Sequence, residues 1–251
     1  MRVLITRPRK DAEEFAEALR QIGAEVLFLP TITIQPVEDT TLLDEALRNL
    51  DRYQWIVFTS ANGVDAVLGR LDSLEITALP SALRIATVGP KTAARLIKAG
   101  FTPDFIPEEY VAEAVLSGLG DLHGRCVLLP TADIARDTLP QGIQAAGGIA
   151  HVITAYHTLP ATPSYDEVAA LASGVDIVTF MSGSAIQNFT SFLRSTGIDP
   201  FNLPGKPLIA CISPKTARVA RGAGFQVDIV AETYTAEGLV RAIASRIESQ
   251  A

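Results

Sequence analysis

The sequence contains the stretch Ile212-Ser213-Pro214-Lys215-Thr216-Ala217, and a near copy of it lies 124 residues earlier. That copy reads Val88-Gly89-Pro90-Lys91-Thr92-Ala93. Aligned without a gap, residues 88–119 and 212–243 are identical at 12 of 32 positions. An apolar residue, a small residue and a proline before good helix formers predict a buried strand end, a tight turn and a helix start. The chain is therefore expected to contain an internal repeat with this strand-turn-helix in each copy.

Length and composition favour two globular domains. The chain has 251 residues, of which 48% are hydrophobic, enough for two domains of about 120 residues each. No apolar run approaches the roughly 20 residues that span a bilayer, and the start Met1-Arg2-Val3-Leu4-Ile5 enters a strand-like run without a signal-peptide cleavage site. The net charge of −7 argues against nonspecific binding to nucleic acid or to an anionic membrane. An anionic small molecule remains compatible with it.

The two cysteines, Cys126 and Cys211, each lie in an apolar strand-like run. Such sparse cysteines favour buried thiols over a disulfide or a nucleophile. We therefore expect a reducing, cytoplasmic compartment.

The hydrophobic pattern predicts an α/β protein. The chain opens with a strand at 3–7, a helix at 8–22 and a strand at 26–30, which together are typical of a parallel sheet. Residues 31–37 alternate between apolar and polar, as in a half-exposed strand or an extended connector. Further strands are expected at 55–59, 84–88, 105–106, 127–129, 149–155 and 176–180, a second connector at 156–162, and helices at 40–51, 60–71, 90–99, 110–119, 136–146 and 236–248.

Each copy of the repeat thus holds about five strands and four or five helices in alternation. This pattern predicts two doubly wound, flavodoxin-like parallel sheets rather than a closed barrel.

Polar turns follow many of the predicted strands. Ligands of open parallel sheets bind beyond the carboxyl ends of the strands, and helix N-termini there favour carboxylate or phosphate groups. For any single turn, helix capping alone is the better explanation. Taken together, the turns favour a site for an anionic ligand. They are Thr6-Arg7-Pro8, Ser60-Ala61-Asn62, Gly89-Pro90-Lys91-Thr92, Thr131-Ala132-Asp133, Ser182-Gly183-Ser184 and Ser213-Pro214-Lys215-Thr216.

Several common chemistries find no support. The sequence has no P-loop, no Gly-x-Gly-x-x-Gly after the first strand and no Gly-x-Ser-x-Gly elbow. His123, His151 and His157 show no metal-ligand spacing. Arg136 is either part of an exposed pair with Asp137 or an anion contact. Tyr156 is either a packing residue or a phenol that reaches the ligand.

The ordered set of motifs resembles the uroporphyrinogen-III synthase family over essentially the whole chain. The motifs are Ile-Thr-Arg-Pro at 5–8, Val-Phe-Thr-Ser-Ala-Asn-Gly-Val at 57–64, Val-Gly-Pro-Lys-Thr-Ala at 88–93, Tyr156 after an Ala-Gly-Gly helix end, and Glu-Thr-Tyr-Thr-Ala-Glu-Gly-Leu at 232–239.

The resemblance implies spatial domains that differ from the repeats. Domain one would comprise residues 1–34 and 160–251, and domain two residues 38–156. The crossings at 31–38 and 155–162 would pair as a two-stranded antiparallel linker. The two Pro-Lys-Thr-Ala turns would then belong to different domains.

The resemblance also implies a reaction. Hydroxymethylbilane, a linear tetrapyrrole with eight carboxylates, would close to uroporphyrinogen III with loss of water and inversion of ring D through a spiro intermediate. No metal or organic cofactor is implied. The expected partners are this substrate and, transiently, the enzyme that makes it, with no nucleic acid or membrane, and the expected state is a monomer. The alternatives are a non-catalytic receptor for an anionic small molecule and a nucleotide-dependent transferase.

The resemblance implies that Tyr156, by its position in the family's motifs, assists departure of the hydroxyl group of hydroxymethylbilane. Arginines and lysines would neutralise carboxylates, and small polar residues would hold the substrate. One departure from the family pattern is Thr131-Ala132, which stands where an Arg-Gly pair is expected and puts a contact from that turn in doubt. The implied binding residues are Arg7, Ser60, Asn62, Thr92, Arg136, Ser182, Ser213, Lys215 and Thr216.

Overall fold

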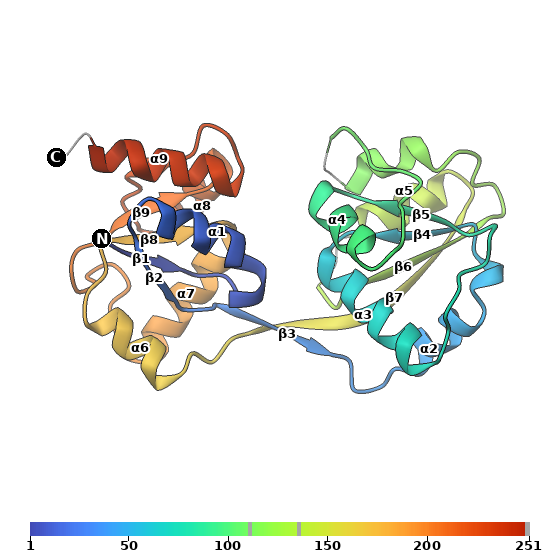
Figure 1. Cartoon of the computed structure of the whole chain (residues 1–251), viewed down its shortest axis with the longest axis horizontal. Coiled ribbons are helices and arrows are strands. Elements are labelled where there is room, and N and C mark those ends of the chain that lie inside the picture. The colour runs from blue at the N-terminus through green and yellow to red at the C-terminus, as the bar shows by residue number, and fades with distance from the viewer. Residues whose placement is uncertain (110–111, 135–136, 249–251) are drawn as a thin grey trace. The chain divides into compact units, whose positions relative to one another are not determined.

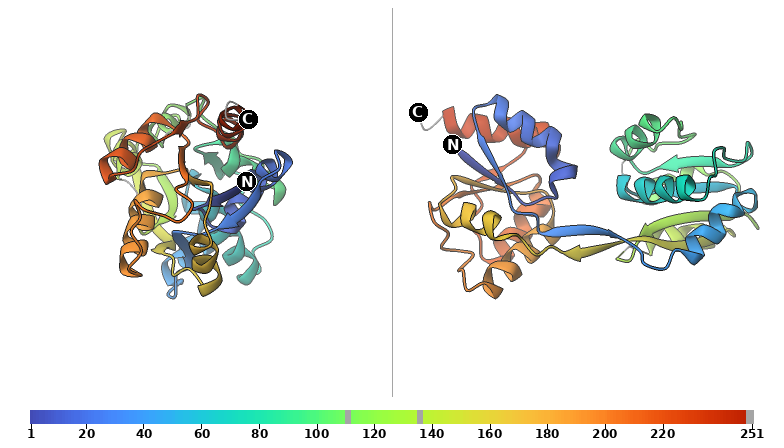
Figure 2. Two further views of the ribbon diagram at one scale, coloured as in Figure 1. Left: turned by 90° about the vertical axis from the view of Figure 1, so that its left-hand side faces the viewer. Right: turned by 60° about the horizontal axis from the view of Figure 1, so that its bottom comes forward.

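The chain is an α/β protein built from two compact units. The structure, a computed structural model, describes residues 1–109, 112–134 and 137–248. Unit 1 comprises Met1–Thr33 and Leu159–Ala251, and unit 2 comprises Ile34–Thr158. Each unit has its own five-stranded sheet covered by helices on both faces (Figures 1 and 2).

The sheet of unit 1 has the strand order β10-β9-β8-β1-β2, and all four neighbouring pairs are parallel. The central strands are short and their buried residues are apolar apart from Thr179 of β8, as expected for strands buried on both sides. The strands are β1 (Arg2–Ile5), β2 (Glu25–Phe28), β8 (Ile177–Phe180), β9 (Leu208–Cys211) and β10 (Ile229–Val230).

Two helix layers enclose this sheet. On one face Phe15 and Leu19 pack with Leu239 and Ile243. On the other face an aromatic cluster forms the core, in which Phe189 meets Phe180 edge-on with ring centroids 5.3 Å apart. The first layer consists of α1 (Arg9–Gln21) and α9 (Ala236–Glu248), and the second of α6 (Tyr165–Ala172), α7 (Gly183–Ser195) and α8 (Pro214–Ala223).

The sheet of unit 2 has the order β3-β7-β6-β4-β5. The pairs β7–β6, β6–β4 and β4–β5 are parallel. The chain passes from one unit to the other within the neighbouring strands β3 and β7. The strands are β3 (Ile32–Pro36), β4 (Trp55–Phe58), β5 (Arg84–Thr87), β6 (Cys126–Ala132) and β7 (Ile149–Pro160).

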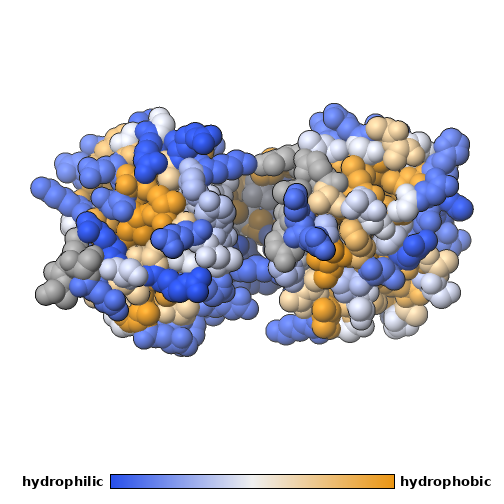
Figure 3. All heavy atoms as spheres, turned by 90° about the horizontal axis from the view of Figure 1, so that it is seen from above, coloured by the Kyte–Doolittle hydropathy of each residue, from blue (hydrophilic) through white to orange (hydrophobic). Residues whose placement is uncertain are grey.

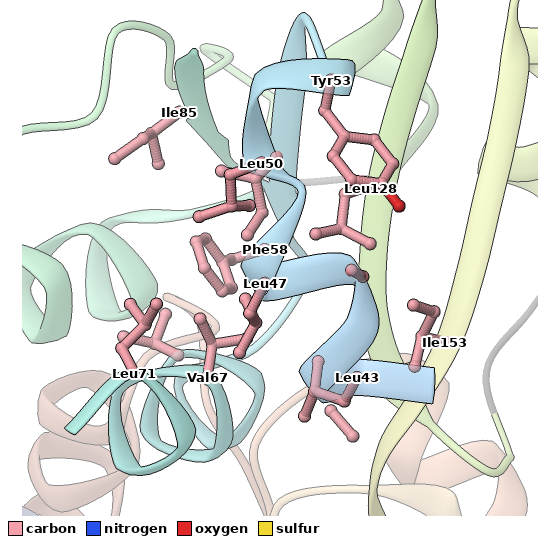
Figure 4. Close-up of a cluster of buried hydrophobic side chains, with 14 of the residues drawn as sticks. Leu43, Leu47, Leu50, Tyr53, Phe58, Val67, Leu71, Ile85, Leu128 and Ile153 are labelled. Carbon is pink, nitrogen blue, oxygen red and sulfur yellow. The ribbon is translucent and has the colours of Figure 1, made fainter. Parts of the chain in front are cut away.

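Helices also cover both faces of this second sheet. Figure 4 shows Leu43 and Leu47 of one helix and Val67 of the next meeting Phe58 and Ile153 of the sheet. This layer contains α2 (Thr41–Arg48), α3 (Ala61–Ser73) and α4 (Pro90–Lys98), with the short 3-10 helix η1 (Leu50–Arg52) after α2, and the opposite layer contains the 3-10 helix η2 (Ala112–Gly118) and α5 (Thr138–Ala145).

The predicted helix at 236–248 is confirmed by α9, but three other segments differ from expectation. Residues 149–160 form one continuous strand, because Ile153 and Ala155 both face the core and no turn residue interrupts them. The segment at 105–106 makes only an isolated bridge between Phe105 and Ala86, and prolines at 103 and 107 limit longer pairing. Helix α6 is an element that the sequence reading missed.

The predicted helix at 110–119 is also wrong in type. Residues 110 and 111 lie outside the described part of the chain, and residues 112–118 form a 3-10 helix. Gly118 lies directly against the Phe105 ring, since a Cβ added there would come within 2.3 Å of it. Close packing of this segment on the sheet, rather than local propensity, therefore sets its conformation.

The polar residues of the surface dominate the view in Figure 3, with apolar patches on each unit. In the described part of the chain, no helix is both long enough and apolar enough to cross a membrane.

The same backbone contact recurs in the two copies of the repeat. Asp104 Oδ2 accepts a hydrogen bond of 2.7 Å from the Ile85 N–H, and Asp228 Oδ2 accepts one of 2.8 Å from the Ile209 N–H. Both N–H groups belong to the second residue of a strand, β5 or β9. The aspartate retained in both copies therefore holds the start of a strand that lies earlier in its own copy, the strand that leads into the Pro-Lys-Thr-Ala turn.

We predict that Asp104→Ala and Asp228→Ala each lower the free energy of unfolding by about 1–3 kcal/mol, because each leaves a part-buried strand N–H without an acceptor. Urea unfolding of the full chain measures the effect. Asp72→Ala is the control, since Asp72 is exposed and its side chain makes no hydrogen bond or ion pair within the described residues. Equal stability of all three variants would refute the role of the two aspartates.

Candidate active site

The carboxyl ends of parallel strands gather at one edge of each sheet, and helices begin there. In unit 2, β4 leads to Ser60, β5 to Gly89 and β6 to Asp133. In unit 1, β8 leads to Ser182 and β9 to Ser213. Each unit therefore presents polar residues and helix N-termini at the edge where ligands of open α/β sheets bind.

Ser60 and Tyr156 form a hydrogen-bonded pair at the edge of unit 2. Ser60 is the N-cap of α3, and its Oγ accepts the Gly63 N–H at 3.0 Å. The same Oγ lies 2.8 Å from the Tyr156 hydroxyl. Tyr156 lies in β7 opposite Ala132, and only 7% of its surface is exposed. The phenol is thus held by a helix cap rather than left to rotate in solvent.

Gly63 explains how α3 comes so close to the sheet. A Cβ at this position would lie 3.1 Å from the Pro130 carbonyl oxygen and 3.4 Å from Ser60 Oγ. The Ser-Ala-Asn-Gly sequence therefore combines a capping hydroxyl with the small residue that lets the first helical turn lie against β6. Asn62 within this turn is half-buried.

The first turn of α4 lies next to this pair in the sheet order, because β5 neighbours β4. Gly89 is the N-cap, Pro90 is the first helical residue, Lys91 is exposed and Thr92 is 6% exposed. Gly89 has no side chain to cap the helix.

The corresponding turns of unit 1 are capped by serine. Ser182 Oγ accepts the Ala185 N–H at 3.1 Å. Ser213 Oγ accepts the Thr216 N–H at 3.2 Å and lies 3.1 Å from the Thr216 hydroxyl. Lys215 in the same turn is exposed.

Arg7 follows β1 at the same edge of unit 1. Its guanidinium Nη1 lies 3.7 Å from the Met181 sulfur. Within the described residues, no carboxylate pairs with Arg7, so its charge is available to an anionic ligand. Arg136, which was also predicted to bind, lies outside the described residues.

The sequence reading missed the pairing of Asp133 with His157. Asp133 Oδ1 accepts the Thr158 N–H at 3.0 Å, and Oδ2 lies 3.0 Å from His157 Nδ1. Two hydrogen bonds hold the pKa of the Asp133 carboxyl below its usual value. The one from the Thr158 N–H has the larger effect, and the one with His157 comes second. The sequence offers two signals for this pair: an aspartate directly after one strand and a histidine near the end of another. Neither signal shows that the two residues meet, because only the β6–β7 register brings them together.

This contact predicts a dependence on pH. The pKa of Asp133 is lower in the folded state than in the unfolded state. The ionised carboxylate therefore stabilises the fold fully at pH values above its unfolded-state pKa of about 3.9. This stabilisation is lost as the pH falls through the folded-state pKa. Asp133→Asn should therefore lower the melting temperature at pH 7 and make little difference at pH values below the folded pKa. Asp51→Asn, at an exposed position, serves as the control. A melting-temperature difference for Asp133→Asn that stays constant with pH would refute the prediction.

The structure thus brings together two pairs of predicted residues, Ser60 with Tyr156 and Ser213 with Thr216. No group of three or more metal-ligating side chains gathers among residues 1–109, 112–134 and 137–248.

Comparison with known proteins identifies the family. The model of the family described as uroporphyrinogen-III synthase HemD matches residues 13–241. The uroporphyrinogen-III synthase of Synechococcus elongatus is 31% identical over 246 residues, which cover 96% of this chain and 93% of that protein. A putative uroporphyrinogen-III synthase of Methanocaldococcus jannaschii is 31% identical over 97% of this chain and 98% of its own length.

Solved structures show the same fold. The uroporphyrinogen-III synthetase of Helicobacter pylori has a TM-score of 0.66 at 16% identity, covering 98% of this chain and 100% of that chain. A mutant uroporphyrinogen III synthase of Thermus thermophilus has a TM-score of 0.64 at 18% identity, covering 99% of each chain. Because the family model and the relatives extend over nearly the whole sequence, the chain belongs to the uroporphyrinogen-III synthase family.

Proposed function

We propose that this protein is a lyase that closes hydroxymethylbilane to uroporphyrinogen III in tetrapyrrole biosynthesis. Membership of the family is the observation that carries this proposal. The polar edges of the two sheets are suited to a substrate with eight carboxylates, since helix N-termini and cations bind such groups.

The first chemical step is loss of the substrate hydroxyl. The C–O bond breaks, the hydroxyl leaves as water with one added proton, and an azafulvene cation remains. Tyr156 donates a hydrogen bond or proton to the departing oxygen. Its contact with Ser60 at 2.8 Å supports this role, because a buried phenol held in one orientation needs little reorganisation in the transition state.

The second step sets the isomer. The substituted carbon of ring D bonds to the cation and gives a spiro-pyrrolenine. Cleavage of the other bond at that carbon, closure at the remaining position and loss of a proton invert the ring. The protein's contribution is to fold the flexible tetrapyrrole so that this carbon is the one that attacks.

Carboxylate binding holds the tetrapyrrole in that conformation. Arg7 and Lys215 supply positive charge, and the turns at Ser60-Asn62, Thr92, Ser182 and Ser213-Thr216 supply backbone N–H groups and hydroxyls. Arg136 is proposed as a further cation on the basis of its sequence position alone. Many contacts to backbone N–H groups make the site tolerant of single substitutions.

Both sheets are proposed to be flavodoxin-like. In unit 1 the order β2-β1-β8-β9-β10 follows chain order as 2-1-3-4-5, which is the flavodoxin arrangement. In unit 2 the strands β7-β6-β4-β5 read 2-1-3-4 if β6 and β7 are counted first and β4 and β5 next, which matches the first four strands of that arrangement, and β3 is added outside β7. The shared aspartate contacts at Asp104 and Asp228 support an origin of the two copies by duplication.

We further propose that the protein acts in a reducing compartment and as a monomer. Cys126 and Cys211 are both unpaired thiols, which supports a reducing compartment such as the cytoplasm. We propose a monomer that contacts the enzyme supplying hydroxymethylbilane only transiently.

The isomer composition of the product tests this function. Freshly made hydroxymethylbilane closes spontaneously to the symmetric isomer I, so the protein should convert it to isomer III without any added nucleotide or metal. A product that contains isomer I alone would favour a non-catalytic receptor. Calorimetric binding of ATP or NAD would favour a nucleotide-dependent transferase; we expect none.

A further inference from the structure

Strand β7 presents Tyr156 and His157 on opposite faces of the sheet of unit 2. The register with β6 shifts just before the pair Ala132–Tyr156, which makes Ala155 an extra residue in β7. Because of this bulge, Ala155 and Tyr156 both lie on the face that α2 and α3 cover, where they belong to one core cluster. By alternation, His157 lies on the opposite face, which α5 covers.

Asp133 lies beside His157, just beyond the end of β6. Each is the next residue after the pair Ala132–Tyr156, so both follow the last paired position of the two strands. Asp133 Oδ1 accepts the Thr158 N–H at 3.0 Å, and Oδ2 lies 3.0 Å from His157 Nδ1. The Asp133 N–H donates to the Tyr156 carbonyl oxygen at 3.3 Å. The pair is therefore fixed to the backbone of β7 at the carboxyl edge, where ligands of open parallel sheets bind.

The contact with Asp133 selects one tautomer of the His157 ring. Because the pKa of Asp133 lies below its usual value, the carboxylate is ionised near neutral pH and accepts a hydrogen bond from the Nδ1–H. Neutral His157 then carries a lone pair on Nε2, to which no described residue donates a hydrogen bond. The His157 side chain is 38% exposed, so a ligand can reach it. Asp133 also stabilises the imidazolium that forms when Nε2 takes up a proton.

The proposed reaction moves two protons at different places on the substrate. One proton enters at the departing hydroxyl, for which Tyr156 is the proposed donor. The other leaves the carbon of ring D at which the macrocycle closes: the C–H bond breaks, its electron pair restores the aromatic pyrrole, and a base receives the proton. One proton is taken up and one is released, so no further reactant is needed. Until the second proton leaves, the new carbon–carbon bond can reopen, and a positioned base therefore commits the closed ring.

We propose that His157 Nε2 is the base that removes the proton from ring D, and that Asp133 is the positioning residue that holds the imidazole for this step. The proposal rests on the proposed function for the identity of the substrate. It gives the two faces of β7 different tasks. Tyr156 supplies a proton on the face that α3 covers, and His157 receives one on the face that α5 covers.

A substrate isotope effect tests the role of His157. Hydroxymethylbilane that carries deuterium on the unsubstituted carbon of ring D is compared with the unlabelled substrate, and the formation of isomer III is followed. The wild type should show little isotope effect on kcat, because a positioned base removes the proton quickly. His157→Gln should lower kcat about 100-fold with little change in KM, and should show a primary isotope effect, because proton loss then limits the rate. An isotope effect no larger than that of the wild type would overturn the proposal.

Asp133→Asn tests the positioning role with His157 still present. An amide can donate to Nδ1 and so keep the ring proton on Nε2, where no lone pair then remains. This variant should therefore show the same kind of isotope effect as His157→Gln when it is assayed well below its melting temperature. His123→Gln is the matched control, since His123 is exposed and precedes β6 at the amino edge of the same sheet. It should keep normal kcat and show no added isotope effect.

The outcomes separate this role from the function on which it rests. Wild-type protein that forms isomer III, with no added isotope effect in His157→Gln or Asp133→Asn, would overturn the role of His157 alone. An equal loss of kcat in His123→Gln would do the same, because the effect would not be specific to His157. Wild-type protein that forms only isomer I would overturn the proposed function, and the role of His157 with it.

Discussion

Replacing Tyr156 by phenylalanine is expected to lower kcat by about 100- to 10,000-fold, the range in which a single proton donor contributes to catalysis. The ring and its packing remain, and only the hydroxyl bonded to Ser60 at 2.8 Å is removed. KM should change little, because the hydroxyl acts on the departing oxygen rather than on the carboxylates. Steady-state kinetics with hydroxymethylbilane and isomer analysis measure both constants.

Tyr53→Phe is the matched control for this substitution. Tyr53 is also buried, at 6% exposure, and its hydroxyl lies 2.5 Å from His151 Nδ1. It precedes β4, however, and so lies at the amino edge of the same sheet. This variant should keep normal kcat. Full activity of Tyr156→Phe would remove the proposed role, and kcat below a ten-thousandth of normal with an intact fold would contradict the prediction that substrate orientation carries much of the catalysis.

The second large effect is expected at Gly238, where alanine should lower the free energy of unfolding by about 3 kcal/mol or more through overpacking. A Cβ at Gly238 would lie 2.0 Å from the Thr233 carbonyl oxygen and 2.9 Å from its carbonyl carbon. Because both atoms belong to the backbone, the loop before α9 must move to accommodate the methyl group. Chemical denaturation of the full chain measures the loss.

Gly222→Ala in α8 is the control, and we expect it to stabilise the protein instead of destabilising it. Gly222 has nothing within 4 Å of an added Cβ and lies in a helix. Alanine should raise the free energy of unfolding by about 0.5–1 kcal/mol through helix propensity. If Gly238→Ala also raised the free energy of unfolding, the overpacking expected between position 238 and the Thr233 backbone would be refuted.

The turns were predictable because their signals are local. The sequence places Ser60 and Ser213 directly before a predicted helix, and both are N-caps in the structure. The alternation of strands and helices gave the α/β class, which the family structures confirm. Helix α6 also has a local signal in the sequence, since Ser164 and Glu167 form a capping box.

Contacts between distant segments could not be predicted in this way. Tyr156 and Ser60 are 96 residues apart, and their contact depends on the pairing of β6 with both β4 and β7. The same β6–β7 register pairs Asp133 with His157. Local sequence describes what each strand end offers, whereas the order of the strands decides which ends meet.

The isomer composition of the product in a single turnover shows whether the protein closes hydroxymethylbilane with inversion of ring D. With the protein in excess over freshly made hydroxymethylbilane, spontaneous closure has little time to compete. We expect a product that is essentially all uroporphyrinogen III, without added metal or nucleotide. A product that remains isomer I at every excess of protein would contradict it.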